Sequence, residues 1–233
     1  MGVLSPAYVL TLGLTVLGAG TLTFASRHWP GAWTGGARRL LALVLLGISS
    51  AWVATNSGGH WSPATSLPLA LCDIATLVAA AALWWEVPIL VELTYFWGLA
   101  GSLQSLLTPD LRVGFPSMEF FEYVVGHSAI VTAAAFLVFG LRHYPRSWAV
   151  PRCLGITAAY TALVGGVDAL TGGDYMYLRR PPASWTLLRL LGPWPWYVLS
   201  AAAVAAVLLA ALDSPFWRLR RRAASHQPTV RTA

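Results

Sequence analysis

Seven long apolar runs dominate this chain and restrict it to one class of fold. They cover approximately residues 6–26, 39–55, 66–85, 88–107, 121–141, 150–170 and 194–213. Because a helix rises about 1.5 Å per residue, each run is long enough, or nearly so, to cross a hydrocarbon core of about 30 Å. Only 10% of the residues are charged, against about 25% in soluble domains. The sequence therefore predicts an all-α membrane protein: a bundle of about seven transmembrane helices that forms one polytopic domain over residues 1–217.

Arginine supplies all of the formal positive charge, because the chain has no lysine. Eleven of the 15 arginines fall into three clusters, which are Arg27, Arg38 and Arg39; Arg142, Arg146 and Arg152; and Arg218, Arg220, Arg221, Arg222 and Arg231. Such clusters beside apolar spans usually face the cytoplasm and its anionic lipid. With seven spans, all three share that side only if the N-terminus is outside and the C-terminus is cytoplasmic, so we predict this orientation. Residues 218–233 are expected to be a basic, disordered cytoplasmic tail. A topology signal explains the clusters better than nucleic-acid binding does.

Polar side chains recur near the outer ends of four predicted spans. Cys72 and Asp73 lie six and seven residues after the start of the third span, and His127 lies six residues after the start of the fifth. Gln104 and Asp168 lie three and two residues before the outer ends of their spans. Polar and ionisable groups at membrane depth are costly, and each is a functional hypothesis by default. The pattern predicts one polar layer in the outer leaflet.

The chemistry of this layer centres on Cys72. A thiol becomes a useful nucleophile when a neighbouring base takes its proton, and His127 is the natural base because it is the one histidine inside a predicted span. A carboxylate from Asp168 or Asp73 would hold the imidazole in one tautomer, and Gln104 would donate a hydrogen bond to an oxyanion. The alternative is that the cysteine only packs and the histidine only bonds a neighbouring helix.

Asp73 follows Cys72 directly, but it points about 100° away from it on a helix. Its charge would also disfavour the thiolate, so we interpret Asp73 as a structural or orienting residue. Cys153, at the inner end of the sixth span, has no base nearby in the sequence and is expected to be structural. No His, Cys or Asp pair shows the spacing of zinc ligands. We predict neither a metal nor a cofactor, and the absence of lysine excludes a retinal Schiff base.

Two outer connections, residues 108–120 and 171–193, are long and contain Gly, Pro and aromatic residues. Such loops suit a cap over a site or a stable lid. The second connection carries Asp174, which we assign to the polar pocket, and a tyrosine and arginine group that would contact a lipid headgroup: Tyr175, Tyr177, Arg179 and Arg180. Arginine binds phosphate in a bidentate manner. An interfacial anchor is the alternative role for these side chains.

Five motifs in this order resemble the YwaF-type bacterial integral membrane proteins. They are residues 67–73, 97–110, His127, residues 174–178 and residues 191–197. The resemblance implies a multi-pass protein of the bacterial plasma membrane. A more distant resemblance extends to eukaryotic multi-pass proteins described as cysteine-dependent acyltransferases that move a fatty acyl chain onto lysophospholipids. It implies that Cys72 is the nucleophile and His127 its companion. Many relatives have His where Ala70 stands and Asn where Asp174 stands.

Three functions remain open from the sequence. The first is an enzyme that transfers or hydrolyses the acyl group of a lipid through a thioester on Cys72, in the outer half of the bilayer. The second is a non-enzymatic transporter, small-molecule binder or assembly factor that uses the same polar pocket. The third is a scaffold whose polar groups only join helices. Membrane lipids are the expected partners and nucleic acid is not, while the oligomeric state stays open.

Overall fold

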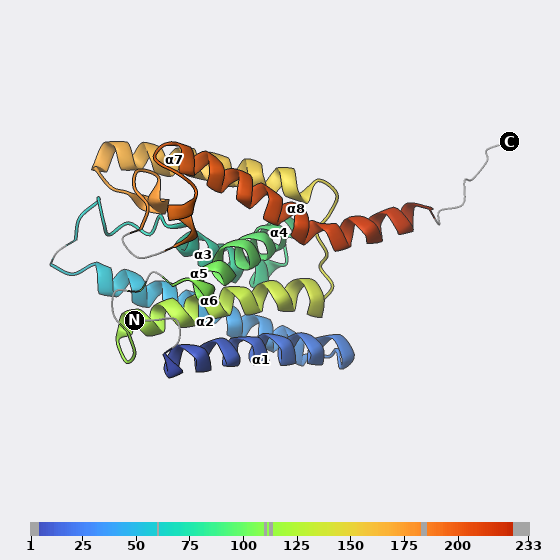
Figure 1. Cartoon of the computed structure of the whole chain (residues 1–233). Coiled ribbons are helices and arrows are strands. Elements are labelled where there is room, and N and C mark those ends of the chain that lie inside the picture. The colour runs from blue at the N-terminus through green and yellow to red at the C-terminus, as the bar shows by residue number, and fades with distance from the viewer. Residues whose placement is uncertain (1–4, 60, 110, 112–113, 183–185, 226–233) are drawn as a thin grey trace.

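The computed structural model describes residues 5–59, 61–109, 111, 114–182 and 186–225. Within these residues the chain forms helices and no strands, arranged as seven rods that run side by side (Figure 1). The rods are α1 (Pro6–His28), α2 (Trp33–Asn56), α3 (Leu71–Trp85), α4–α5 (Pro88–Phe96 and Leu103–Leu107), α6 (Met118–Ala135), α7 (Ala149–Thr171) and α8 (Trp196–Ser225). A π-helical turn, Trp97–Ser102, joins α4 to α5, and another, Phe136–Gly140, extends α6. Two 3₁₀ turns, Tyr175–Tyr177 and Leu187–Leu190, lie before α8.

Five helices in the described part of the chain are long and apolar enough to cross a membrane: α1, α2, α6 with its π-helical turn, α7 and α8. The shorter α3 is also apolar. The prediction of an all-helical, multi-pass membrane protein is therefore confirmed. The predicted orientation of the termini stays a prediction.

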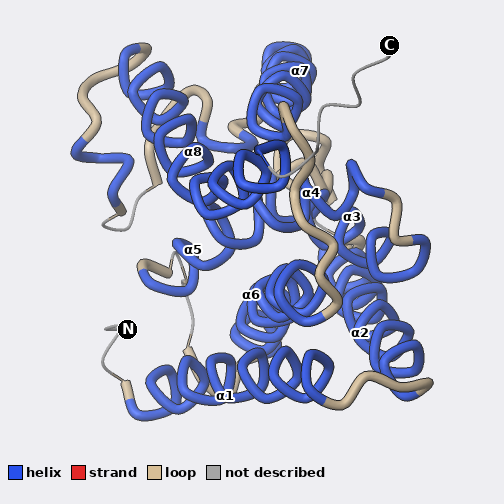
Figure 2. The backbone as a smooth tube through the Cα atoms, turned by 90° about the vertical axis from the view of Figure 1, so that its right-hand side faces the viewer, coloured by secondary structure: helices blue, strands red, loops and turns tan. Residues whose placement is uncertain are grey.

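Helix α6 lies at the centre of the bundle (Figure 2). In its most apolar stretch 67% of the residues are buried, against 11–17% in α1, α2, α7 and α8. Helix α6 shares an apolar core with α3 and α4. Its members, each at most 1% exposed, include Ala79, Leu83, Phe96, Ile130 and Phe136. Helices at the periphery of the bundle, such as α1 and α8, expose large apolar side chains, as lipid-facing helices do. The centre of the bundle is therefore where polar groups can be shielded from lipid.

The ends of the helices follow local sequence signals. Ser117 precedes α6, and its Oγ accepts a hydrogen bond from the Phe120 N–H at 3.1 Å, as a helix N-cap does. Pro88 begins α4, where its missing N–H costs nothing. Gly172 ends α7 at φ 76°, a left-handed conformation that glycine adopts without strain. These signals account for boundaries that hydropathy alone places only approximately.

The third helix begins later than predicted. The apolar run starts near residue 66, but α3 begins at Leu71. Pro68 lacks an N–H and keeps the residue before it out of the helical conformation. The Asp73 carboxylate then accepts a hydrogen bond from the Ala70 N–H at 3.0 Å, which fixes the first turn. The helix therefore begins at Leu71, inside the predicted span rather than at its start.

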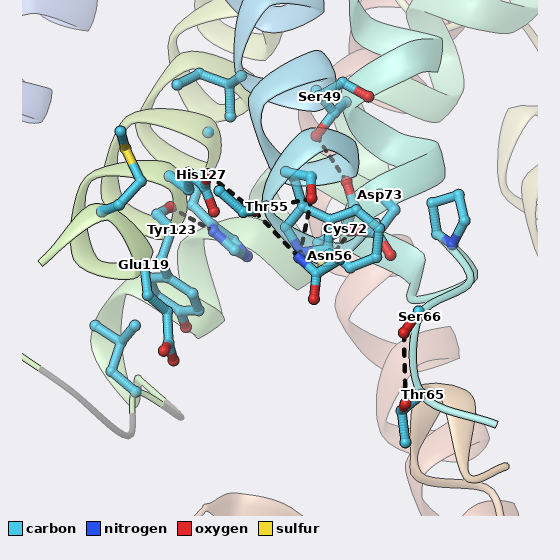
Figure 3. A pocket seen from close by; sticks show the side chains of 18 of the residues that line it. Ser49, Thr55, Asn56, Thr65, Ser66, Cys72, Asp73, Glu119, Tyr123 and His127 are labelled. Atoms are coloured by element: carbon cyan, nitrogen blue, oxygen red, sulfur yellow. Dashed lines mark hydrogen bonds between the residues drawn. The ribbon is translucent and has the colours of Figure 1, made fainter. Parts of the chain in front are cut away.

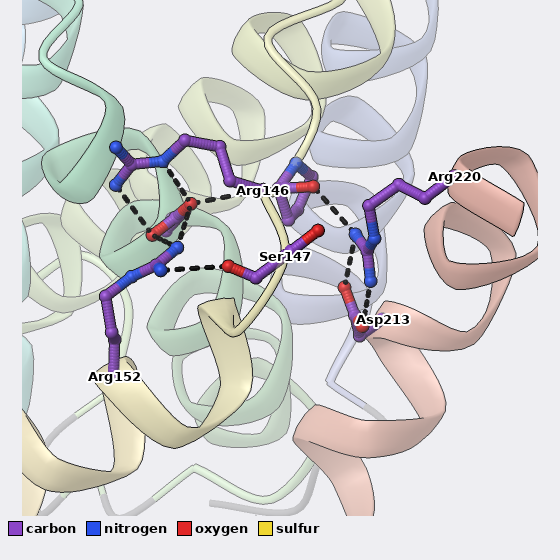
Figure 4. Close-up of polar contacts among 7 residues, drawn as sticks. Arg146, Ser147, Arg152, Asp213 and Arg220 are labelled. Atoms are coloured by element: carbon purple, nitrogen blue, oxygen red, sulfur yellow. Dashed lines mark hydrogen bonds and ion pairs between the residues drawn. The ribbon is translucent and has the colours of Figure 1, made fainter. Parts of the chain in front are cut away.

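The three arginine clusters lie at one end of the bundle, where the buried Glu92 and the partly exposed Glu86 pair with some of their members. The Arg146 and Arg152 guanidinium groups converge on Glu92 (Figure 4), with their nearest N–O distances to its carboxylate at 2.9 and 3.0 Å. Arg38 and His143 both pair with Glu86. Because these pairs join α2, α4, α7 and the residue 141–148 loop, they bring the clusters together as predicted. Arg112 and Arg231 lie outside the described residues.

The predicted disordered tail is wrong for residues 218–225, which continue α8 to Ser225. Arg220 donates to the Asp213 carboxylate at 2.6 Å and to the Pro145 carbonyl at 2.8 Å (Figure 4). The Arg221 guanidinium lies 4.5 Å from the centre of the Trp217 ring, a stabilising cation–π contact. These contacts hold the extra helical turns, and residues 226–233 lie outside the described part.

We expect Glu92→Ala to lower the stability of the folded protein by about 1–3 kcal/mol, because it removes the buried acceptor of the Arg146 N–H and of two arginine side chains. Thermal unfolding in detergent would measure the loss. Glu86→Ala is the matched control, since the Glu86 side chain is 32% exposed and that of Glu92 is 2% exposed. Equal losses in the two variants would contradict this account of the network.

The orientation can be tested with single cysteines in a Cys72→Ala, Cys153→Ala background. We expect an impermeant maleimide to label Ser57→Cys in intact cells, because Ser57 follows α2 at the end away from the arginine clusters. Ser147→Cys, in the arginine-rich loop, should be labelled only after permeabilisation. The reverse pattern would invert the predicted topology.

Candidate functional site

Cys72 is the second residue of α3 and lies in its first turn. Its Sγ is 3.9 Å from Asp73 Oδ1, and its carbonyl accepts a hydrogen bond from Thr76 Oγ1 at 2.8 Å. The unpaired N–H groups of a first helical turn favour a negative charge such as a thiolate. The Asp73 carboxylate opposes that charge. The first turn of α3 therefore favours the Cys72 thiolate, whereas the neighbouring Asp73 carboxylate disfavours it.

His127 is nine residues after the start of α6, whereas Cys72 is one residue after the start of α3. The two residues therefore lie at different distances from their helix starts, and their equal depth in the membrane stays a prediction. They nevertheless line the same cavity, since the late start of α3 brings its first turn beside the middle of α6.

This cavity, called cavity A below, has a volume of about 770 Å³. Helices α2, α3 and α6 form its walls. Figure 3 shows Cys72 and Asp73 on one side, His127 and Glu119 on the other, and Asn56 between them. Its polar lining comprises Ser49, Thr55, Asn56, Thr65, Ser66, Cys72, Asp73, Thr76, Glu119, Glu122, Tyr123 and His127. A cavity of this size accommodates a substrate-sized ligand.

The His127 ring is fixed in orientation. Nδ1 lies 2.7 Å from the Tyr123 carbonyl oxygen, and the ring packs on the Tyr123 ring with centroids 4.2 Å apart. Because a carbonyl oxygen only accepts, Nδ1 carries the hydrogen. Nε2 is then the basic nitrogen of a side chain that is 6% exposed. No hydrogen bond joins His127 to Cys72 within the described residues, and catalytic hydrogen bonds are often long without substrate.

Two carboxylates of cavity A were not predicted as site residues. Glu119 and Glu122 lie in the first turns of α6 and both line the cavity, and Thr55 Oγ1 donates to Glu122 at 3.3 Å. The spacing of these residues in the sequence could have identified them as members of the site. Glu119, Glu122, Tyr123, Gly126 and His127 follow the i, i+3, i+4, i+7, i+8 pattern of one helix face.

A second cavity, cavity B, lies on the other side of the first turn of α3 and has a volume of about 890 Å³. Cys72, Asp73, Trp52 and Thr65 line both cavities. The other walls of cavity B come from the π-helical turn Trp97–Ser102 and from the loop after α7. Among them are Leu71, Ala75, Trp97, Gly101, Ser102, Ser105, Asp174, Tyr175, Tyr177, Arg180 and Pro182. Cys72 thus stands between two cavities.

Three of the four predicted headgroup residues, Tyr175, Tyr177 and Arg180, line cavity B. Arg180 Nε lies 3.7 Å from Asp174 Oδ2. The Tyr175 hydroxyl is used structurally, because it donates to the Pro63 carbonyl and accepts from the Leu67 N–H, both at 2.9 Å. Tyr175 therefore ties the loop after α7 to the segment that leads into α3.

Arg179, also predicted as a headgroup contact, lines neither cavity within the described residues. Its backbone N–H donates to Asp174 Oδ1 at 2.8 Å, so Asp174 organises the backbone of this loop. The same carboxylate accepts from the Arg180 N–H at 3.3 Å. Asp174 therefore combines a structural role with a place in the lining of cavity B.

Gln104 and Asp168 were expected in the polar layer, but neither lines cavity A or B in the described part of the chain. Gln104 Nε2 donates to Thr108 Oγ1 at 2.9 Å within its own rod. Asp168 is 1% exposed and its Oδ1 accepts from the Tyr175 N–H at 2.9 Å. Gln104 thus secures the end of α5, and Asp168 positions the loop that carries Tyr175.

The geometry supports nucleophilic or binding chemistry at Cys72 more than metal chemistry. No group of three or more His, Cys, Asp and Glu side chains arranged to hold a metal ion occurs among the described residues. Cys153, the other cysteine, is fully buried in the apolar core. Of the two thiols, Cys72 is the one with access to a cavity.

The chain matches the sequence model of the TMEM164 family over residues 3–213, so it belongs to this multi-pass membrane family. Comparison with curated proteins finds no match, and comparison with solved structures finds none either. The family match carries neither the YwaF-type name nor an activity. Both resemblances suggested by the sequence motifs therefore stay predictions.

We expect Tyr175→Phe to loosen the entrance to α3, because it leaves the Leu67 N–H and the Pro63 carbonyl without their partner. Such a loss costs about 1–3 kcal/mol. The rate at which a small maleimide alkylates Cys72, measured by mass spectrometry, should rise. Tyr144→Phe, at the arginine-rich end, is the control. An unchanged rate in Tyr175→Phe would show that the hydroxyl does not hold this segment.

Proposed function

We propose that this TMEM164-family protein is a thiol-dependent lipid acyltransferase or acyl-lipid hydrolase. The observation that carries the proposal is the shared cavity, which is lined both by the Cys72 thiol on α3 and by the oriented His127 imidazole on α6. Thiol nucleophiles are commonly activated by an adjacent histidine. The resemblance of residues 67–73 and His127 to cysteine-dependent acyltransferases points in the same direction. The YwaF-type resemblance supports a place in the bacterial plasma membrane.

The reaction would proceed in two steps through a thioester. In the first, Sγ of Cys72 forms a bond to the ester carbonyl carbon of a lipid and the ester C–O bond breaks, while His127 Nε2 transfers the thiol proton to the leaving oxygen. In the second, a hydroxyl of a lysolipid or of water attacks the thioester, and its proton returns through His127 to Sγ. General acid–base catalysis of this kind contributes about 10²–10⁴-fold.

Asp73 and the residues of the outer loop would act around this pair. Asp73 holds the first turn of α3 through its bond to the Ala70 N–H, so it positions Sγ. Of the predicted headgroup residues, Tyr175, Tyr177 and Arg180 line a cavity beside Cys72, and the Arg180 guanidinium would contact a lipid phosphate. Gln104, with its side-chain amide on Thr108, is not assigned a role in the reaction.

A non-enzymatic binder is the second candidate. It is favoured by the present contacts of the two central residues: Sγ faces the Asp73 carboxylate at 3.9 Å, and His127 Nδ1 bonds the Tyr123 carbonyl. In that case the carboxylates and the histidine of cavity A bind a polar small molecule, and the thiol is incidental. Binding or transport that survives alkylation of Cys72 would favour this function.

We expect Cys72→Ala to abolish acyl transfer from a phospholipid to a lysophospholipid in nanodiscs, and His127→Gln to lower it by about 100-fold or more. Release of labelled product measures both. Cys153→Ala is the matched control, because it removes the fully buried thiol, and it should retain activity. Full activity in Cys72→Ala would refute the proposed mechanism.

A further inference from the structure

Another hollow, called the α1–α6 groove below, lies between helices α1 and α6, which run side by side (Figures 1 and 2). Its volume is about 310 Å³. It shares no lining residue with cavity A or cavity B, and it lies toward the end of the bundle that carries the arginine clusters. Its walls include Ala19, Gly20, Phe24 and Arg27 of α1, together with Ala135 and Phe139 of α6 and its π-helical turn.

Two side-chain contacts hold α1 against α6 on either side of this groove. Thr15 Oγ1 lies 2.7 Å from Ser128 Oγ, and Arg27 Nη1 donates to the Phe139 carbonyl at 3.1 Å. Between these contacts Gly20 has no side chain to fill the space, and a Cβ added there would meet no atom within 4 Å. The two helices are therefore fixed in contact at both ends of a space that their own side chains leave unfilled.

The α1–α6 groove has the direction and polarity of part of a phospholipid. Arg27 lies in the last turn of α1, and the exposed Trp29 follows that helix. Tryptophan rings prefer the membrane interface. Ala19, at the other end of the groove, lies eight residues before Arg27, which is roughly 12 Å along the helix. The groove therefore runs from a charged end at the interface to an apolar end in the hydrocarbon region.

The charge of Arg27 has no carboxylate partner within the described part of the chain. The carboxylates at the same end of the bundle, Glu86, Glu92 and Asp213, pair with other arginines. No Asp or Glu among the described residues lines the groove. Arg27 is therefore free to bind an anion from the surrounding membrane, whose cytoplasmic surface is anionic and attracts arginine.

We propose that the α1–α6 groove binds an anionic phospholipid, with its phosphate at Arg27 and one acyl chain along the groove toward Ala19. The Arg27 guanidinium uses one N–H for the Phe139 carbonyl, so its other N–H groups can donate to phosphate oxygens. Phe24, which is 53% exposed, lies against the chain. A zwitterionic lipid adds an ammonium group, for which the described lining offers no carboxylate. The lipid in this groove is a bound ligand and not a substrate, whatever reaction Cys72 carries out.

Two variants each remove one half of the proposed site. Gly20→Phe places a ring in the groove, whereas its matched control, Gly18→Phe, places the same ring at an exposed position of α1 that does not line the groove. Arg27→Gln removes the charge. Its control is Arg39→Gln, because Arg39 is exposed at the same end of the bundle and does not line the groove or either cavity. Retained thermal unfolding temperatures would establish that each variant is folded.

The measurement is photocrosslinking in detergent micelles with phosphatidylglycerol that carries a diazirine in one acyl chain, followed by mass spectrometry of the crosslinked peptides. In the wild-type protein we expect crosslinks to residues 19–24 and 135–139. Unlabelled phosphatidylglycerol should displace the probe about fivefold more effectively than phosphatidylcholine with the same acyl chains, which is the effect of one arginine at a membrane surface. Arg27→Gln should keep the crosslinks but lose this preference, and Gly20→Phe should lose the crosslinks. Both controls should behave as wild type does.

Three results would overturn the inference. Equal displacement by the two lipids in the wild-type protein would mean that the groove accepts acyl chains without regard to charge. Unchanged crosslinks in Gly20→Phe would mean that the lipid binds elsewhere. An equal loss of preference in Arg39→Gln and Arg27→Gln would mean that the arginine-rich end attracts anionic lipid as a whole. None of these results bears on Cys72, so the proposed function stands or falls separately.

Discussion

The non-helical segment that leads into α3 is the constraint on which the site depends. Backbone N–H and C=O groups at membrane depth must find partners within the protein or beside a polar cavity. Tyr175 satisfies Pro63 and Leu67, the Tyr160 hydroxyl donates to the Leu69 carbonyl at 3.0 Å, and Asp73 accepts from Ala70. With its backbone held in this way, the segment delays the start of the helix to Leu71. That delay places Cys72 between two cavities rather than inside a continuous apolar rod.

Hydropathy predicted the helices because each apolar run is a nearly complete rod, and arginine counting predicted which loops share one end. The late start of α3 was missed because Pro68 lies inside a run that is apolar throughout. Hydropathy does not register the proline's missing N–H. The tail was missed for a different reason: the pairing of Arg220 with Asp213 and Pro145 depends on tertiary contact, which a basic composition does not reveal.

The candidate site was predicted in part. Cys72, Asp73 and His127 line one cavity, although α3 and α6 begin at other residues than the apolar runs suggested. Gln104 and Asp168 lie toward the end of the bundle opposite the arginine clusters, but their side chains make local hydrogen bonds instead. The distance of a residue from the end of its helix gives its position along the helix axis, but the direction of its side chain depends on which helix face it occupies. Glu119 and Glu122 share a face of α6 with His127, and this pattern would have identified them as site residues.

The central claim is that Cys72, and not the buried Cys153, receives an acyl group from lipid. Peptide mapping by mass spectrometry of the wild-type protein, quenched in acid after incubation with phospholipid, tests it most directly. The account predicts an added acyl mass on the peptide that contains Cys72, removed by hydroxylamine. An unmodified Cys72 peptide, or an acyl mass on Cys153 instead, would contradict it.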